Sequence, residues 1–306
     1  MAALETRGLT KRFGDTVAVH NLDLTVDEGE VFGFLGPNGA GKSTTINMIL
    51  DFMRPTAGSV AVLGTNPRQN PRAVRERIGV LPEGYDLYDR LTARKHVTFA
   101  IEMKRSNDDP ETILERIGLA ADADKAIGGY SKGMRQRLAL GMALVGDPDL
   151  LVLDEPSSGL DPNGARAMRE IISTEQDRGA TVFFSSHIME QVEPVCDRVG
   201  IMRDGELVAV DTVDGLRESA GAESTLVLSV DTVPQQHALF DIPGVTDVQC
   251  IDSTIHVNCS DSSVKADIIT AVEATGTSVQ DITIQDRSLD DLFAEYTTEN
   301  AAEGQA

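Results

Sequence analysis

A glycine-rich segment near the amino terminus has the spacing G-x-x-x-x-G-K-[ST]. Its residues are Gly36, Pro37, Asn38, Gly39, Ala40, Gly41, Lys42, Ser43 and Thr44. The apolar run 31–35 before it predicts a buried strand, and residues 44–50 after it predict a helix. In that context, backbone N–H groups and the helix N-terminus surround phosphate groups, Lys42 neutralises their charge and Ser43 ligates Mg²⁺. The segment therefore predicts a phosphate-binding loop for a nucleoside triphosphate.

Two adjacent acids follow a second apolar run, residues 150–153. An acid at the end of a strand can hold the Mg²⁺ shell through water, which is the role predicted for Asp154. Glu155 points elsewhere and is placed to polarise an attacking water. By itself the segment could equally be a strand that ends in a solvated acidic turn. Beside a phosphate-binding loop, the catalytic interpretation is favoured.

A serine and a glycine lie between these two segments in the stretch Y-S-K-G-M, residues 130–134. This stretch resembles the signature motif of the ATP-binding cassette (ABC) ATPases, which is usually L-S-G-G-Q. Ser131 and Gly133 are kept, whereas Lys132 and Met134 depart from the common form. The resemblance implies that Ser131, Lys132 and Gly133 face an ATP molecule bound by a second cassette. Without it, Ser131 would be only a helix N-cap.

The other landmarks of the family follow in order. Asp161, in residues 158–162, matches the D-loop that crosses the dimer interface. His187 follows the apolar run 181–185 and matches the switch histidine, which contacts the γ-phosphate. Phe13, 29 residues before Lys42, matches the aromatic residue that stacks on adenine. Taken alone, His187 would be an ordinary loop residue, and Phe13 would be a core residue near the first hairpin.

One landmark is altered. The family's Q-loop carries glutamine, but residues 79–85 offer Glu83. A carboxylate can still coordinate Mg²⁺, although it adds negative charge near the γ-phosphate. The substitution predicts either slower turnover or a stronger dependence on the metal.

Length and composition limit the possible classes of protein. The 306 residues suffice for one large and one small domain. No apolar stretch reaches the roughly 20 residues of a transmembrane helix, and no basic-then-apolar signal peptide opens the chain. The expectation is a cytoplasmic chain unless a membrane partner holds it. The three cysteines do not form a disulfide framework, and Cys250, His256 and Cys259 are expected to be structural.

Net charge is −22 and unevenly distributed. Residues 219–306 contain 2 basic and 15 acidic residues, a net charge of −13, and the first 218 residues carry −9. Such a surface repels nucleic acid, so no nucleic-acid partner is expected. It suits a protein that works in concentrated salt, and a halophilic source is the favoured explanation. An acidic docking face on the C-terminal segment is the alternative.

The pattern of elements predicts an ABC ATP-binding domain over residues 1–218. An antiparallel hairpin region is expected within 4–28, split by Gly14 and Asp15, and a further turn and strand are expected within 54–65. A charged, helical pattern from about 89 to 147 is the place of the family's α-helical subdomain. Apolar strands return at 150–153 and 181–185, each followed by a helical pattern. The fold class is therefore α/β, a P-loop NTPase cassette with parallel strands, an antiparallel β subdomain and an α-helical subdomain.

A second domain is expected over residues 222–297, followed by a tail, 298–306. The predicted strands are 225–230, 245–251, 254–258 and 279–284, and the predicted helices are 233–240, 264–275 and 289–296. The order β-α-β-β-α-β indicates a small ferredoxin-like α+β domain. Residues 288–293 resemble the end of the drug-resistance (ABC-2 type) exporter ATPases.

The resemblance implies an ATP hydrolase that uses ATP and Mg²⁺ and drives an ABC transporter. Its implied partners are an ABC-2 type transmembrane permease encoded separately and a second ATPase subunit, expected to form a homodimer. The chain would lie at the cytoplasmic face of the cell membrane, and a groove beside residues 83–88 would receive the permease's coupling helix. Nothing in these residues identifies the transported substrate.

Two alternatives belong to other classes. A soluble ABC ATPase in translation or DNA repair would carry two cassettes in one chain or a long coiled-coil insertion, and neither is seen. A nucleotide switch without turnover would lack Glu155 or His187, and both are present.

Overall fold

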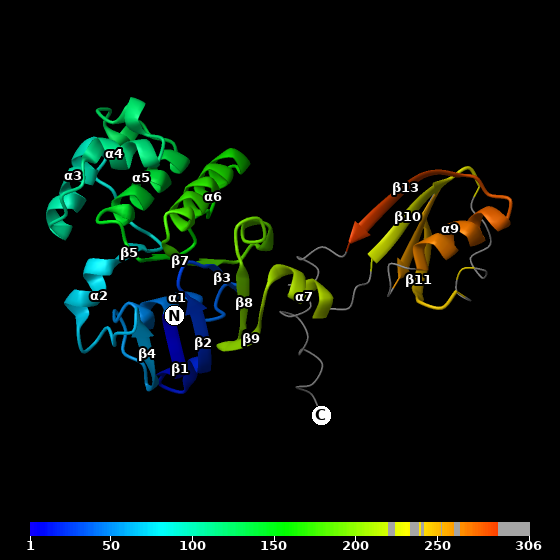
Figure 1. Ribbon diagram of the computed structural model, residues 1–306, viewed down its shortest axis with the longest axis horizontal. Helices are drawn as coiled ribbons and strands as arrows, with labels where there is room; N and C mark the ends of the chain where they lie inside the picture. Colours follow the sequence, from blue (N-terminus) through cyan, green and yellow to red (C-terminus); the bar gives the residue numbers. More distant parts are fainter. Residues whose placement is uncertain (220–223, 233–238, 240–241, 252, 260–263, 287–306) are drawn as a thin grey trace. The chain divides into compact units, whose positions relative to one another are not determined.

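The computed structural model describes residues 1–219, 224–232, 239, 242–251, 253–259 and 264–286. The chain divides into two compact units, residues 1–213 and 214–306 (Figure 1). None of the helices in the described part is long and apolar enough to cross a lipid bilayer.

A six-stranded sheet forms the centre of the first unit. Its order is β5-β6-β7-β3-β8-β9, and all neighbours are parallel except β8 and β9. The strands are β3 (Val31–Leu35), β5 (Ile78–Leu81), β6 (Leu150–Leu153), β7 (Thr181–Ser186), β8 (Arg198–Arg203) and β9 (Glu206–Asp211). Every residue of β3, β6 and β7 is buried, as expected for parallel strands covered on both faces. The predicted parallel α/β core is confirmed.

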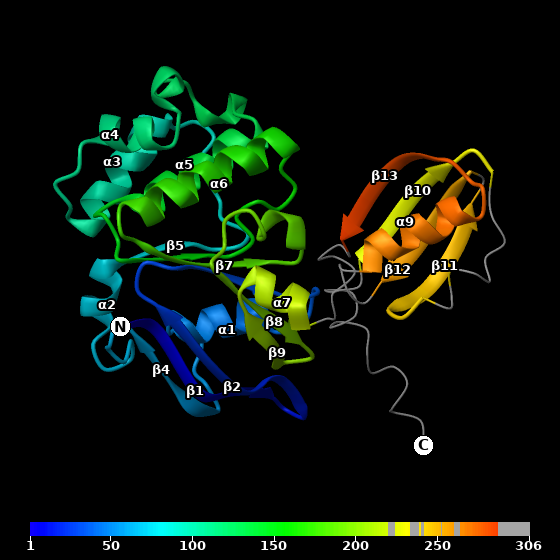
Figure 2. The same cartoon turned by 45° about the vertical axis from the view of Figure 1, so that its right-hand side comes forward.

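A second, antiparallel sheet of order β2-β1-β4 packs in the same unit (Figure 2). Its strands are β1 (Ala2–Phe13), β2 (Thr16–Asp27) and β4 (Ala57–Val62). One hydrophobic core joins both sheets and helix α1 (Lys42–Ile49), through side chains such as Leu4, Phe32 and Ile49. The predicted split at Gly14 and Asp15 is confirmed, because β1 ends at Phe13 and β2 begins at Thr16. The β1–β2 ladder shifts register between Leu9 and Lys11, and Asn21 on the opposite strand takes a left-handed conformation with φ 45°, as at a β-bulge.

The helical part of this unit lies on the far side of the six-stranded sheet from β1, β2 and β4 (Figures 1 and 2). Its helices are α3 (Ala93–Lys104), α4 (Pro110–Arg116) and α5 (Lys132–Leu144), while α2 (Pro71–Arg77) and α6 (Pro162–Asp177) flank the sheet. Side-chain oxygens cap all five helices, accepting a backbone N–H of the first turn. The predicted helical subdomain is confirmed.

The second unit is a four-stranded antiparallel sheet with one described helix on its face. A short helix, α7 (Val213–Ser219), lies at the junction of the two units. The sheet order is β11-β12-β10-β13, and the elements are β10 (Ser224–Val230), β11 (Val245–Ile251), β12 (Thr254–Cys259), α9 (Lys265–Ala274) and β13 (Val279–Asp286). Alternate residues of β10 and β12, including Leu226 and Val257, pack beneath Ile268 of α9. The helices predicted at 233–240 and 289–296 lie outside the described residues, apart from residue 239.

Candidate active site

The predicted site residues follow four neighbouring strands of the central sheet and lie at the carboxyl ends of those strands. The strands β5, β6, β7 and β3 are adjacent and parallel, so their carboxyl ends meet. Glu83 follows β5, Asp154 and Glu155 follow β6, His187 follows β7, and the glycine-rich loop follows β3. Ligands bind at this edge in open α/β sheets. Segments distant in sequence thus converge because of strand order.

The glycine-rich loop turns directly into α1. Gly41 is the N-cap at φ 105°, and a Cβ there would overlap the backbone oxygen of Ala18, so glycine is required. The ammonium of Lys42 is 6% exposed and donates to the Gly36 oxygen at 2.6 Å and to the Pro37 oxygen at 3.3 Å. The first N–H groups of α1 and this ammonium face the same region, an arrangement suited to anions.

A cavity of about 400 Å³ opens between this loop and two of the acids. Its lining residues are Ala18, Pro37, Asn38, Gly39, Gly41, Lys42, Ser43, Thr44, Glu83 and Glu155. The remaining loop residues, Gly36 and Ala40, lie behind this surface, where a Cβ at Gly36 would come within 2.5 Å of the Met202 oxygen. The structure therefore brings most of the phosphate-binding loop together with Glu83 and Glu155.

Asp154 is buried and held by a serine. Its Oδ1 accepts from Ser185 Oγ at 2.6 Å, and Ser185 Oγ in turn accepts from the Glu155 backbone N–H at 3.0 Å. Burial raises the pKa of Asp154, while hydrogen bonds from Ser185 and Ser43 act in the opposite direction. Sequence reasoning missed Ser185. The available signal was a hydroxyl directly after the apolar residues 182–184, near the carboxyl end of a strand that pairs with β6.

Glu155 lies between a cation and an imidazole. Its Oε1 is 3.4 Å from Lys42 Nζ, and its Oε2 is 2.9 Å from His187 Nδ1. The side chain is 8% exposed, and the residue adopts φ 50°, a conformation unusual for a residue with a Cβ. Such strain of about 1–3 kcal/mol concentrates at functional sites, where the surrounding structure maintains it.

The donor set fits Mg²⁺. Ser43, Glu83 and Asp154 offer hydroxyl and carboxylate oxygens, the ligands that this hard cation prefers. No group of three or more His, Cys, Asp or Glu side chains is placed to hold a metal within the part of the chain that the structure describes. Mg²⁺ usually binds proteins through one or two carboxylates together with substrate phosphates.

The remaining predicted residues do not join this cavity. Ser131 caps α5 and accepts from the Met134 N–H at 3.2 Å; Asp161 caps α6 and accepts from the Gly164 N–H at 2.7 Å. The ammonium of Lys132 lies against Gly159, where it would overlap a Cβ. Gly133 is in the first turn of α5. The residues of the signature motif and Asp161 therefore lie at the first turns of α5 and α6, outside the cavity of their own chain.

Phe13 also lies apart, at the end of β1. Its ring is 49% exposed, and Lys11 Nζ is 4.9 Å from the ring centroid. Phe13 is therefore not a core residue near the first hairpin, which was the alternative interpretation. Half of its surface is exposed and could contact a planar ligand.

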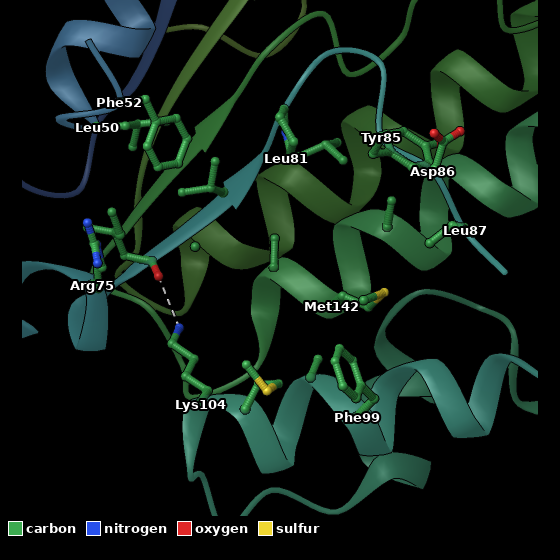
Figure 3. A pocket seen from close by; sticks show the side chains of 18 residues that line it. Leu50, Phe52, Arg75, Leu81, Tyr85, Asp86, Leu87, Phe99, Lys104 and Met142 are labelled. Atoms are coloured by element: carbon green, nitrogen blue, oxygen red, sulfur yellow. Dashed lines mark hydrogen bonds between the residues drawn. The ribbon is translucent and has the colours of Figure 1, made fainter.

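An apolar groove of about 550 Å³ lies next to the loop that follows β5 (Figure 3). Its apolar lining includes Leu50, Phe52, Leu81, Phe99, Met103 and Met142. Phe52, Phe99 and Met103 are exposed. Charged side chains, Arg75, Asp86 and Lys104, also line it, and Lys104 Nζ donates to the Ile78 oxygen at 3.0 Å. The groove is a surface of the kind that protein partners cover.

Comparison with known proteins identifies both units. Residues 19–158 match the family described as ABC transporter, and residues 212–297 match the C-terminal domain of DrrA1-3-like ATP-binding proteins. The chain is 39% identical over 221 residues to the bacitracin transport ATP-binding protein BcrA of Bacillus licheniformis, covering 70% of this chain and 71% of that protein.

A longer relative and a solved structure agree with this assignment. The fluoroquinolones export ATP-binding protein of Mycobacterium tuberculosis is 35% identical over 298 residues, 96% of this chain and 93% of that protein. A solved structure of an ATP-binding subunit of an ABC transporter superposes with a TM-score of 0.64 at 30% identity, covering 71% of this chain and 93% of its own. The chain therefore belongs to the ABC transporter family, as an ATP-binding and ATP-hydrolysing subunit.

Proposed function

We propose that this ATPase subunit works as a homodimer, bound at the cytoplasmic face of the membrane to a separately encoded ABC-2 type permease, and that it drives export. The match of residues 212–297 to the DrrA1-3-like C-terminal domain supports the ABC-2 assignment. Export is supported by relatives whose names describe fluoroquinolone export and linearmycin resistance. The permease carries the cargo path in this proposal.

The cavity that joins Lys42, Ser43, Glu83 and Glu155 is the observation that carries the catalytic proposal. Lys42 binds the β- and γ-phosphates, and the N–H groups at the start of α1 orient them. Ser43, Asp154 and Glu83 hold Mg²⁺, which when bound neutralises charge on the phosphates. Glu155 accepts a proton from the attacking water, and His187, 2.9 Å from Glu155, contacts the γ-phosphate.

In this proposal each ATP lies between the phosphate-binding cavity of one chain and the signature residues of the other, so each chain contributes to two sites. Ser131, Lys132, Gly133 and Asp161 lie on helix starts outside their own cavity. A second chain arranged head to tail would bring these residues against the phosphates of the first. Phe13, half exposed at the end of β1, would stack on the adenine. Closure of two cassettes around ATP and reopening after hydrolysis then move the permease.

The apolar groove is the proposed seat of the permease's coupling helix. Its exposed aromatic and methionine side chains suit the apolar face of a short amphipathic helix (Figure 3). Arg75, Asp86 and Lys104 offer charges of both signs to the polar residues of such a helix.

Expression of the chain with and without the permease encoded beside it tests the proposal. The purified chain should hydrolyse ATP in the presence of Mg²⁺, and it should sediment with membranes only when the permease is present. Phe99→Asp, in the groove, should release it from membranes without abolishing ATP binding. Co-sedimentation with ribosomes or DNA, with no effect of the permease, would instead favour the soluble alternative.

A further inference from the structure

The loop that joins β5 to the helical part carries Glu83 and Tyr85 to two different surfaces. Glu83 lines the nucleotide cavity, whereas Tyr85 lines the apolar groove (Figure 3). Gly84 separates them at φ 70°, with no atom near the position of a Cβ, so the chain reverses direction there without steric resistance. Two residues that are only two positions apart therefore line different surfaces.

The hydroxyl of Tyr85 reaches further, to the signature helix. It donates to Gln136 Oε1 at 2.6 Å, and Gln136 is 6% exposed within α5. Burial raises the pKa of the Tyr85 phenol to about 12, so the hydroxyl keeps its proton and remains a donor at any physiological pH. Gln136 follows the cap residue Ser131 by five positions, about 7.5 Å along a rigid helix.

The far end of the same loop is fixed separately. The backbone N–H of Tyr88 lies 3.1 Å from His96 Nε2, and His96, in α3, is 3% exposed. This anchor restrains where the loop enters the helical part. The loop therefore has two described side-chain links to α5: the Tyr85–Gln136 bond beside the nucleotide cavity, and an ion pair of Asp89 with Arg135 at 2.6 Å near its far end.

We propose that Tyr85 is a positioning residue that couples the nucleotide cavity to the signature serine through Gln136. When a ligand of Glu83 moves the loop, the Tyr85 hydroxyl moves Gln136, and α5 carries the displacement to Ser131. A partner helix in the groove would press on the same Tyr85 ring. The inference rests on the proposed head-to-tail dimer, because Ser131 acts there on the ATP of the second chain.

The test separates binding of ATP from ATP-driven association in the full-length chain. Tyr85→Phe removes the hydroxyl and keeps the ring, and Tyr88→Phe, three positions on in the same loop and 72% exposed, is the matched control. A fluorescent ATP analogue measures affinity at low chain concentration, and sedimentation measures the ATP concentration that gives half-maximal dimer. For Tyr85→Phe, affinity should stay within about twofold of wild type while the dimerisation midpoint rises about two- to tenfold, the equivalent of one neutral hydrogen bond.

A second variant and a melting curve keep the test decisive. Gln136→Leu should shift the midpoint like Tyr85→Phe, and the double variant should be no worse than either single variant. Unchanged midpoints in both single variants would overturn the coupling role, as would equal losses of affinity and melting temperature, which would indicate a purely structural bond. If the wild-type chain itself neither dimerises with ATP nor hydrolyses it, the proposed function fails, and this inference with it.

Discussion

The carboxylate of Glu155 and the imidazole of His187 lie 2.9 Å apart, between Oε2 and Nδ1. The other oxygen of Glu155 is 3.4 Å from Lys42 Nζ. The acid is therefore positioned by two neighbours, one from the strand beside it and one from the phosphate-binding loop. A proton acceptor held in this way does not have to be ordered when the reaction begins, which is the benefit of preorganisation.

Glu155→Gln should bind ATP with Mg²⁺ but hydrolyse it about 10²–10⁴ times more slowly, the usual contribution of a general base. Glutamine has the same length and can tolerate the same backbone, but it cannot take up the proton. Phosphate release gives the rate, and the elution volume with ATP should reveal a persistent dimer. Glu206→Gln, at a carboxylate 60% exposed on β9, is the control. Hydrolysis by Glu155→Gln near the wild-type rate would assign the base to another residue.

Lys42→Ala should lower ATP affinity by about 10- to 100-fold, the range for hydrogen bonds to a charged group. The ammonium is buried at the start of α1, and among the described residues no other lysine or arginine lines the cavity. Titration with a fluorescent ATP analogue measures the loss. Lys125→Ala, at an ammonium 70% exposed and paired with Asp122, should bind as wild type does. Unchanged affinity in Lys42→Ala would refute the phosphate-binding role.

Glu83→Gln restores the residue usual in the family. If the carboxylate of Glu83 joins the Mg²⁺ shell, the variant should need a higher Mg²⁺ concentration for half-maximal ATPase activity, while ATP affinity stays nearly the same. A titration of ATPase rate against Mg²⁺ gives the comparison. Superimposable curves would make Glu83 a residue of the loop's structure and not of the metal site.

Short sequence patterns predicted the features that depend on a few consecutive residues: turns, helix caps and buried strands. The glycine spacing predicted the turn into α1, and Ser131 was recognised as a possible helix cap. The apolar runs 31–35 and 150–153 predicted buried parallel strands. The fold class followed because each of these signals is complete within a few residues.

Contacts between distant segments could not be predicted in that way. Ser185 bonds to Asp154 because β7 lies beside β6, and Tyr85 reaches Gln136 because the loop after β5 crosses α5. Neither pairing leaves a periodic pattern in the sequence.

A buried ion pair links α4 of the helical part to α6, which flanks the central sheet, and its loss should destabilise the first unit. The side chains of Arg116 in α4 and Glu175 in α6 are 7% and 3% exposed, and Arg116 Nη2 lies 2.5 Å from Glu175 Oε2. Glu175→Ala leaves the guanidinium buried, with the exposed Asp147 as its one remaining ionic partner among the residues that the structure describes, so the free energy of unfolding should fall by about 3–5 kcal/mol. Hydrogen exchange of the α4 and α6 amides reports on this unit alone.

The double variant Arg116→Met with Glu175→Leu is the control for that pair. Removing both charges avoids an isolated buried ion, so it should cost less than Glu175→Ala. Protection in α4 and α6 that is unaltered by Glu175→Ala would mean that the pair contributes nothing to the stability of the unit.

Salt should stabilise the full-length chain more than a chain that ends after residue 220. Residues 219–306 carry −13 of the net charge of −22. Between 1 M and 0.1 M salt the Debye length grows from about 3 to 10 Å, so repulsion among these carboxylates returns as salt is diluted. The melting temperature of the full-length chain should fall over this range, and that of the shortened chain should fall less, with ATP binding retained.

Differential scanning calorimetry of both chains at each salt concentration provides the comparison. Sodium chloride and potassium chloride are used in parallel to separate screening from a specific ion effect. A melting temperature that is flat across the range would refute adaptation to high salt, and it would leave the acidic segment as a docking surface for a basic partner.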